Sequence, residues 1–253
     1  MAVPFNVVLF FIVSLVFSFN PALAQTVGSV VRVVQCATLE RSGQAVSLRT
    51  GQSIESGDVI STDRRGQVQL LFNDDTRIAV GPNSSMAVDD IRFKQNGKAR
   101  KFAVSAVAGG FRFLSGTSAR SAYAISTPTA TMGIRGTAFD FVVRNTDGTD
   151  LVIFSGLVSM CGAGGCYQVT GGCDAVRLDA RGNFARIEQK KDKRNLLSDG
   201  FYFVTEQQRL RPDFRTKVRS CGRDVISKPA SKAGDRKPPP EPPKEPTGPT
   251  GPT

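Results

Sequence analysis

The sequence TPTATMGIRGTAF, residues 127–139, decides the fold because it joins two strand-forming segments through a pair of glycines. Pro128 cannot donate a ladder hydrogen bond, so it suits the start or the edge of a strand. Gly133 and Gly136 permit backbone geometry, or a close approach, that a Cβ would forbid. The stretch therefore predicts a strand, a tight bend at the glycines, and a second strand that begins near Phe139.

Arg135 is the only charged residue between Arg120 and Asp140. An Arg in such surroundings is either buried against a carboxylate or exposed and directed at a partner. Because Arg commonly ties a loop down inside a fold, we expect the buried arrangement. Loss of the Arg135 side chain should then lower stability or solubility more than it changes binding at the surface.

Short segments of alternating apolar residues flank this stretch on both sides. Turn-forming residues separate them about every 8 to 15 positions from Val27 to Ile187, with no amphipathic helical run of three turns. This spacing predicts an all-β domain that ends near Glu188. Its strands form either a sandwich or a rolled, solenoid-like stack, because periodicity does not separate the two and no strict repeat is present. The expected strands lie at 27–34, 45–48, 59–60, 68–72, 78–80, 86–93, 102–107, 111–114, 139–143, 151–154, 158–160, 167–169, 175–178 and 184–187.

The first 24 residues predict export. An apolar run at 7–19 is followed by an Ala-x-Ala cleavage site that ends at Ala24, and the run is shorter than the roughly 20 residues that span a bilayer. The segment before the run has no Lys or Arg, so its positive charge comes from the amino terminus alone. No Cys follows where a lipoprotein signal needs one, and no later stretch is apolar enough to span a membrane. We expect a mature chain from Gln25 onward in the periplasm or outside the cell.

These signals divide the chain into four parts. Residues 1–24 are the expected signal peptide, 25–188 the β domain, 189–226 a basic extension with a short helix, and 227–253 a disordered tail. Nine prolines among the last 25 residues, with no aromatic residue, predict disorder or polyproline II in that tail.

The extension is expected to begin with a charged link at 189–194 and to include a short apolar patch at 201–204. Thr205, with Gln208 three positions later, resembles a capping box and predicts a short helix through Leu210 that Pro212 ends.

Positive charge is concentrated at the C-terminal end of the chain. Residues 189–253 hold 15 Lys and Arg against 8 Asp and Glu, and the whole chain carries a formal charge of +11. For an exported protein this favours an anionic cell-wall polymer as a partner over nucleic acid, with a purely solubilising role as the alternative.

The sequence contains no histidine, which narrows the chemistry it can perform. Ser-His-Asp and Cys-His nucleophile systems, histidine metal sites and the commonest general base are all excluded. The doublets Asp74-Asp75 and Asp89-Asp90 are the visible carboxylate pairs, yet neighbours on a strand point to opposite faces. We therefore expect no enzyme activity, no cofactor and no metal.

Five cysteines in an exported chain predict two disulfides and one free thiol. Segments 158–160 and 167–169 are the expected arms of a hairpin that places Cys161 opposite Cys166, so these two are a candidate disulfide. The pairing of Cys36, Cys173 and Cys221 stays open. A zinc site of four thiolates is the alternative, and the oxidising compartment argues against it.

An ordered series of motifs resembles the FecR family, the exported domain first described in regulators of ferric-citrate uptake. The resemblance covers about Thr26 to Glu188, and its most specific part is the segment 127–139. The motif residues are Gly28–Val34, GDVI at 57–60, LFNDDT at 71–76, GGFRF at 109–113, then Thr127, Pro128, Gly133, Arg135, Gly136, Thr137 and Phe139, and GLV at 156–158. The resemblance implies a periplasmic all-β domain that is not an enzyme and that, in the signalling members of the family, relays receptor state through protein contacts.

One departure from the regulator matters for function. A signalling member of that family carries a cytoplasmic anti-sigma segment before a membrane helix, whereas this chain begins with a predicted cleavable signal. We therefore do not expect direct control of a sigma factor. The leading hypothesis is a non-enzymatic envelope module that binds a protein partner, in signalling or surface assembly. The second is a carbohydrate or peptidoglycan binder that uses turn residues such as Asp74, Asp75 and Asn83.

Overall fold

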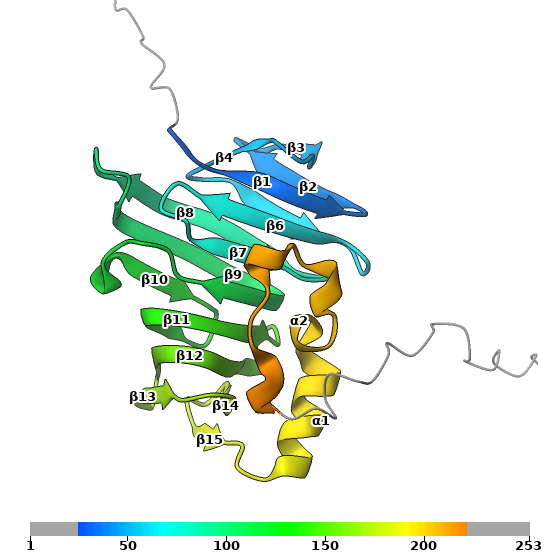
Figure 1. Cartoon of the computed structure of the whole chain (residues 1–253), viewed down its shortest axis with the longest axis vertical. Coiled ribbons are helices and arrows are strands. Elements are labelled where there is room, and N and C mark those ends of the chain that lie inside the picture. The colour runs from blue at the N-terminus through cyan, green and yellow to red at the C-terminus, as the bar shows by residue number, and fades with distance from the viewer. Residues whose placement is uncertain (1–24, 222–253) are drawn as a thin grey trace, which may run out of the picture.

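The computed structural model describes residues 25–221 (Figure 1). The predicted signal peptide at 1–24 and the Pro-rich tail at 227–253 lie outside the described residues, so both stay predictions. Within residues 25–221, none of the helices is long and apolar enough to cross a membrane.

The described chain is built mainly of strands, with helical turns gathered at its C-terminal end. The strands are β1 (Thr26–Val34), β2 (Ala37–Arg41), β3 (Gln44–Ser47), β4 (Ser53–Glu55), β5 (Val59–Thr62), β6 (Gln67–Phe72), β7 (Arg77–Val80), β8 (Ser85–Phe93), β9 (Ala99–Leu114), β10 (Tyr123–Ser126), β11 (Thr131–Val143), β12 (Gly148–Gly162), β13 (Gly165–Thr170), β14 (Asp174–Asp179) and β15 (Phe184–Arg186). The helices are α1 (Lys190–Gly200) and α2 (Tyr202–Thr205), with 3-10 turns η1 (Arg120–Ala122), η2 (Gln207–Arg209), η3 (Pro212–Phe214) and η4 (Val218–Cys221).

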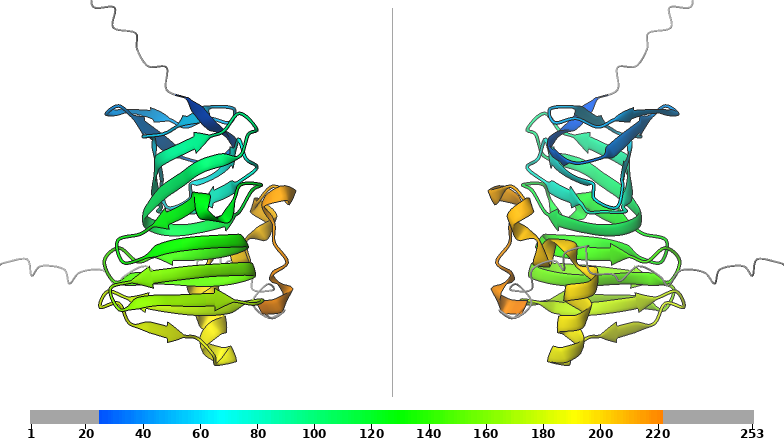
Figure 2. Two further views of the ribbon diagram at one scale, coloured as in Figure 1. Left: turned by 90° about the vertical axis from the view of Figure 1, so that its left-hand side faces the viewer. Right: turned by 90° about the vertical axis from the view of Figure 1, so that its right-hand side faces the viewer.

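All fifteen strands belong to one sheet, which confirms the all-β prediction. The main order is β15-β14-β12-β11-β10-β9-β7-β6-β1-β4, and β8, β5, β2 and β3 branch from β9. The sheet folds back over itself, because β9, β11 and β12 each pair with different neighbours in their two halves. Figure 2 shows the resulting stack of strands. The rolled arrangement is therefore the correct one of the two predicted.

Glycines at positive φ form the corners of this roll. Gly109 in β9, Gly136 in β11 and Gly156 in β12 have φ values of 99°, 60° and 86°, a region that L side chains rarely adopt. At one corner Gly136 and Gly156 stack so closely that a Cβ on Gly156 would lie 2.2 Å from the Gly136 carbonyl oxygen. The predicted bends at 109–110 and 133–136 thus occur inside continuous strands.

The main core lies between the two walls of the roll. Alternate residues of β9 and β11 point inward, so Phe111, Phe113, Phe139 and Phe141 are buried and their rings contact one another. Phe139 and Phe113 have ring centroids 5.4 Å apart. These rings belong to one core cluster that also contains many Val, Leu and Ile side chains, and the burial of this cluster stabilises the roll.

One wall is also covered on its outer side by the C-terminal extension. Leu197, Phe201 and Val204 pack on Val152 of β12, and Phe203, Leu210 and Phe214 pack on Ala79 of β7. The strands beneath are therefore buried on both faces. Figure 2 shows α1 against this wall in its right-hand view, whereas the left-hand view looks onto the wall without helices.

The extension differs from the prediction in two places. Residues 190–194 belong to α1, so the expected charged link is wrong; the helix forms because Leu196 and Leu197 bury against the sheet. The capping box at Thr205 is also wrong. Thr205 ends α2 and its hydroxyl donates to the Tyr202 carbonyl oxygen at 3.1 Å, while only the 3-10 turn η2 follows.

Candidate partner-binding surface

The two walls present very different outer surfaces. We call the outer side of β2, β5, β8, β10, β13 and the adjoining halves of β9, β11 and β12 the open face. The outer side of β1, β6, β7, β14 and the other halves of β9, β11 and β12 is the covered face, on which the C-terminal extension lies. None of the helices between residues 25 and 221 covers the open face, so a partner could bind there.

Small side chains line the middle of the open face. Cross-strand register places Ala103, Ala124, Gly133 and Ser159 in one row across β9, β10, β11 and β12. A second row runs through Ala87, Ser105, Ser126, Thr131 and Cys161. Ala124, Gly133 and Thr131 are exposed, and the other members of these two rows are partly exposed. Such short side chains leave this part of the wall flat and accessible to another protein chain.

Arg135 lies at one end of this wall and is exposed, which contradicts the buried arrangement expected for it. Strand alternation explains the outcome: Ile134 points into the core, so Arg135 beside it points outward, next to the corner at Gly136. No described residue accepts a hydrogen bond from its guanidinium or forms an ion pair with it. We therefore expect Arg135→Ala to weaken the binding of a partner and to have little effect on stability.

Other basic side chains gather at the same end of the open face. β9 and β10 run parallel, so Arg100 near the start of β9 and Arg120 just before β10 lie at this end with Arg135. Both are exposed and, within residues 25–221, neither has a hydrogen bond or ion pair. We call Arg100, Arg120 and Arg135 the basic rim.

A cluster of Asp90, Arg92 and Lys101 adjoins the basic rim. Asp90 receives a hydrogen bond from Lys101 Nζ at 2.9 Å and from Arg92 Nε at 2.8 Å. The hydrogen bond from Lys101 is the largest cause that lowers the pKa of the Asp90 carboxyl, and Arg92 adds to it. Because two cations share one carboxylate, this cluster adds to the positive charge of the rim.

The remaining motif residues hold the fold together. Thr127 caps the turn between β10 and β11, where its hydroxyl accepts from Ala130 N at 2.9 Å and lies 2.9 Å from the Thr149 hydroxyl. Pro128 lies in this turn, so its predicted place at a strand start is wrong. Thr137 is buried and its N–H donates to Ser115 Oγ at 2.9 Å. Phe139 is fully buried in the core.

The covered face carries buried polar residues that sequence reasoning missed. Arg112 is 0% exposed and donates to both carboxylate oxygens of Asp140, at 2.7 and 2.8 Å. It also donates to the Phe203 carbonyl oxygen at 3.0 Å and to Gln207 Oε1 at 2.8 Å. Burial raises the pKa of Asp140, and the Arg112 guanidinium opposes that rise. The motif GGFRF at 109–113 could have indicated that Arg112 lies on the outer face of the sheet. An Arg between two phenylalanines that point inward along a strand must point to the other face.

Gln67 and Gln69 extend this polar contact with the extension. Gln67 Nε2 donates to Tyr202 Oη at 2.7 Å, and Gln69 bonds to the Arg209 carbonyl oxygen and to the Arg211 N–H. Because these side chains bond to the Tyr202 hydroxyl and to backbone atoms of the extension, the covered face is already occupied by the chain itself.

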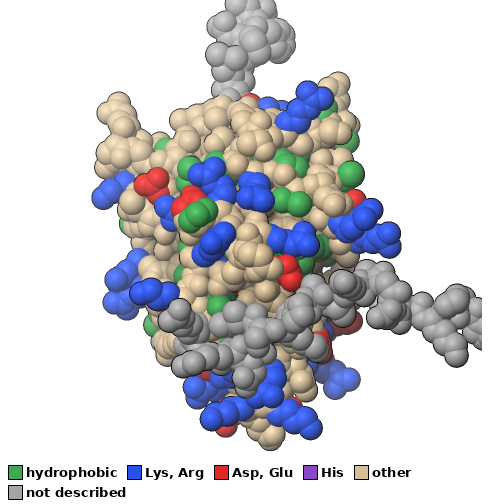
Figure 3. Space-filling view, turned by 45° about the vertical axis from the view of Figure 1, so that its right-hand side comes forward, with side chains coloured by type: hydrophobic (Ala, Val, Ile, Leu, Met, Phe, Trp, Pro, Cys, Tyr) green, Lys and Arg blue, Asp and Glu red, His purple; other side chains and the backbone are tan. Residues whose placement is uncertain are grey.

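Three arginines of the extension have local partners. Figure 3 shows Lys and Arg side chains spread over the side of the molecule that carries the extension. Arg209 pairs with Glu206 at 3.1 Å and Arg211 with Asp213 at 3.3 Å, while Arg215 Nε donates to the Leu210 carbonyl oxygen. These contacts reduce the positive charge that the three arginines can offer to an anion.

The turn residues that a carbohydrate binder would use have structural roles instead. Asp74 is 1% exposed and accepts hydrogen bonds from Tyr123 Oη at 2.8 Å and Ser118 Oγ at 2.6 Å. Asp75 and Asn83 occupy turn positions with φ of 66° and 50°, which Asp and Asn tolerate well. Asp89 accepts from Ser105 Oγ at 2.7 Å and Asp90 is held by its two cations. Neither doublet presents two carboxylates to one point.

The cysteines form two disulfides, Cys161–Cys166 and Cys173–Cys221, and Cys36 is free and exposed. The predicted hairpin disulfide is therefore confirmed, and four thiolates are not available to a zinc ion. Within the part of the chain that the structure describes, no group of three or more His, Cys, Asp or Glu side chains could hold a metal.

The comparison with family models agrees with the motif series. Residues 58–159 match the model of the family described as FecR protein. A candidate anti-sigma factor from Parabacteroides distasonis ATCC 8503 aligns in two crystal structures. The 1.65 Å structure gives 12% identity over 52% of this chain and 59% of that chain, with a TM-score of 0.43. The 2.50 Å structure gives 14% identity over 57% and 66%, with a TM-score of 0.43. The present chain thus spans less than two thirds of that protein, and no curated protein matches it.

Proposed function

We propose that this chain, which contains a FecR domain over residues 58–159, is an exported, non-enzymatic module that binds an acidic protein partner in the cell envelope, in signalling or surface assembly. The match to the FecR family supports a signalling role. The partner would dock on the open face, with its acidic groups against the basic rim.

The observation that carries this proposal is the basic rim. Arg100, Arg120 and Arg135 are exposed at one end of a flat wall, and no described carboxylate neutralises them. Unpaired arginines at the edge of a surface favour carboxylate partners through bidentate hydrogen bonds and speed their association by electrostatic steering. The covered face offers no equivalent area, because the extension occupies it.

The two disulfides support the proposed compartment. Disulfides persist in the periplasm and outside the cell, and they are rare in the reducing cytosol. Non-enzymatic action is supported by the engagement of Asp74, Asp89 and Asp90 in local hydrogen bonds. The basic surplus alone does not favour a cell-wall polymer, since Arg209, Arg211 and Arg215 have partners of their own.

The proposal is tested with a photo-crosslinking residue in living cells. Placed at Ala124, in the middle of the open face, it should capture one defined protein product. The matched control carries the same residue at Gln208, which is exposed on the extension. Capture from Gln208 with none from Ala124 would overturn the assignment of the open face, and no product at either position would overturn partner binding.

A further inference from the structure

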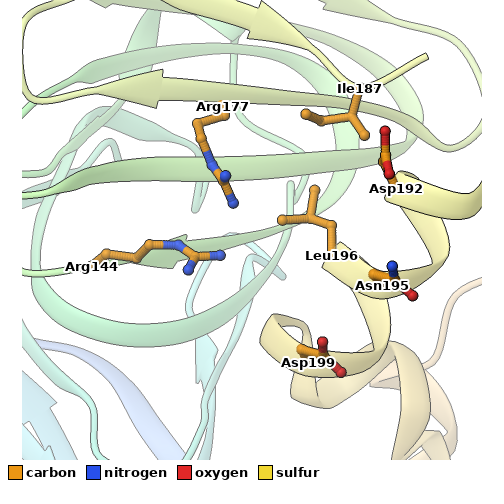
Figure 4. A pocket seen from close by; sticks show the side chains of 7 residues that line it. All are labelled: Arg144, Arg177, Ile187, Asp192, Asn195, Leu196 and Asp199. Carbon is orange, nitrogen blue, oxygen red and sulfur yellow. The ribbon is translucent and has the colours of Figure 1, made fainter. Parts of the chain in front are cut away.

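A cavity of about 330 Å³ lies between the sheet and helix α1 (Figure 4). Of its lining side chains, Arg177 comes from β14, Arg144 directly follows β11, and Ile187 directly follows β15. The others come from successive turns of α1. The lining residues are Arg144, Arg177, Ile187, Asp192, Asn195, Leu196 and Asp199.

The sheet side of the cavity carries uncompensated positive charge. Arg144 Nε donates to Asp150 Oδ2 at 2.8 Å, and Arg177 donates to both oxygens of Asp150 at 2.7 and 3.0 Å. Asp150 is fully buried, whereas the two arginine side chains are 43% and 44% exposed. Two cations therefore share one carboxylate, and part of each guanidinium faces the cavity (Figure 4).

The helix side carries negative charge. Asp192, Asn195 and Asp199 recur at helical spacing, so they lie along one face of α1, as Figure 4 shows. Asp192 has no hydrogen bond or ion pair with any described residue, and Asp199 accepts only from the neighbouring Ser198 hydroxyl at 2.8 Å. Both carboxylates are exposed. Leu196 and Ile187 give the cavity an apolar section.

We propose that this cavity binds a small zwitterion of the amino-acid or short-peptide class. The ligand's carboxylate would take the free N–H groups of Arg144 and Arg177, and its ammonium group would meet Asp192 or Asp199. A simple anion would face the two helix carboxylates, and a simple cation would face the two arginines, so one ligand with both charges fits best. The volume is at the lower end of the range for small-ligand sites.

The dipeptide Ala-Ala is the probe, titrated into the full chain at low salt and followed by NMR chemical shifts. N-acetyl-Ala-Ala lacks the positive charge and Ala-Ala amide lacks the negative one, and each should bind about tenfold more weakly than Ala-Ala. Equal affinity for the three peptides, or no binding of Ala-Ala at millimolar concentration, would overturn the proposal.

Variants assign the two ends of the ligand. Asp192→Asn should weaken Ala-Ala about tenfold and leave N-acetyl-Ala-Ala unchanged, because only the ammonium loses its partner. Asp213→Asn removes an exposed carboxylate outside the cavity and should change neither. Arg177→Gln should weaken Ala-Ala and N-acetyl-Ala-Ala alike, with the fold checked by circular dichroism. If Asp192→Asn binds Ala-Ala with the affinity of the wild type, the ammonium group does not contact Asp192, and the proposed site is contradicted.

Discussion

Arg112 and Arg135 differ in what surrounds each guanidinium. The Arg112 side chain is 0% exposed and its charge is balanced by Asp140 and by acceptors of the extension, whereas Arg135 is exposed and meets no described carboxylate. A buried charge that loses its partner is costly, and an exposed one is hydrated. The first arginine therefore serves the fold, and the second is free to serve a partner.

Arg112→Ala should lower the free energy of unfolding by about 3 to 5 kcal/mol, because it leaves Asp140 buried and unpaired. Arg135→Ala should change it by less than about 0.5 kcal/mol. Urea denaturation of the two variants measures both values. A double replacement Arg112→Met with Asp140→Leu should cost less than Arg112→Ala alone. Equal losses for Arg112→Ala and Arg135→Ala would contradict the contrast between the two sites.

Asp90 should titrate below the usual range of an aspartate, because Lys101 and Arg92 donate hydrogen bonds to its ionised form. A folded-state pKa below the unfolded value stabilises the protein above the unfolded pKa of about 3.9, and this contribution is lost as the pH falls through the folded pKa. NMR titration of the carboxyl carbon measures the pKa.

Lys101→Met should raise the pKa of Asp90 toward its ordinary value. Asp179 is the internal control, since hydrogen bonds from Asn183 lower its pKa and Lys101 does not touch it. An Asp90 pKa that does not move in Lys101→Met would show that the cross-strand ion pair is absent in solution.

The corners of the roll are the elements on which the fold depends. At Gly156 the strand β12 passes from the covered wall to the open wall and stacks on Gly136 of β11. At Gly156, the positive φ disfavours a side chain, and the nearby Gly136 carbonyl oxygen leaves no space for one. The corner therefore sets where β11 turns and hence where Arg135 points.

Gly156→Ala should destabilise the protein by about 1 to 3 kcal/mol more than Gly171→Ala. Both glycines have positive φ, at 86° and 95°, so both substitutions carry a similar backbone strain. A Cβ at Gly156 meets the Gly136 carbonyl oxygen at 2.2 Å, whereas a Cβ at Gly171 meets nothing within 4 Å. Thermal denaturation compares the two, and similar melting temperatures would argue against close stacking at the corner.

The two disulfides should differ in their contribution to stability. Cys173–Cys221 joins residues 48 apart and Cys161–Cys166 joins residues 5 apart. Restriction of the unfolded chain gives about 4 kcal/mol for the longer loop and about 2 kcal/mol for the shorter. Urea denaturation of the two double-serine variants should follow this order. The reverse order would mean that the extension is held by its packing on the sheet with little help from Cys173–Cys221.

Sequence reasoning predicted local features well and long-range ones poorly. Alternation and turn residues located most strands, and the cysteine hairpin followed from its two arms. Strands β2, β4 and β10 were missed, and the segments 102–107 and 111–114 proved to be one strand that bends at Gly109. Which strands pair with one another depends on residues far apart in the chain, and a local sequence pattern does not encode such pairing.

The candidate surface was predictable only in part. The isolation of Arg135 among uncharged residues was visible in the sequence, but its orientation depends on the phase of strand β11 relative to the corner at Gly136. The Arg112–Asp140 pair and its contact with Phe203 join residues 28 and 91 positions apart, so composition could not reveal them. The division of the chain at residue 188 stays a prediction, although residues beyond it pack on the sheet.

At the scale of the whole molecule, the roll has one face occupied by its own C-terminal segment and one face that no element within residues 25–221 covers. The occupied face is matched by buried hydrogen bonds and apolar packing, as in the contacts of Arg112 and Phe203. The free face has small side chains and a basic rim. This asymmetry is the basis of the proposed partner-binding role, in which the open face with Arg120 and Arg135 recognises an acidic protein.

The most direct test combines the photo-crosslinking residue at Ala124 with charge reversal at the basic rim. In cells that make the protein, Arg120→Glu with Arg135→Glu should abolish the captured product, because like charges repel an acidic partner. The matched control Lys190→Glu with Lys191→Glu reverses two exposed charges on α1 and should leave the product unchanged. A product that survives reversal at Arg120 and Arg135, or that is lost equally in the control, would contradict the account.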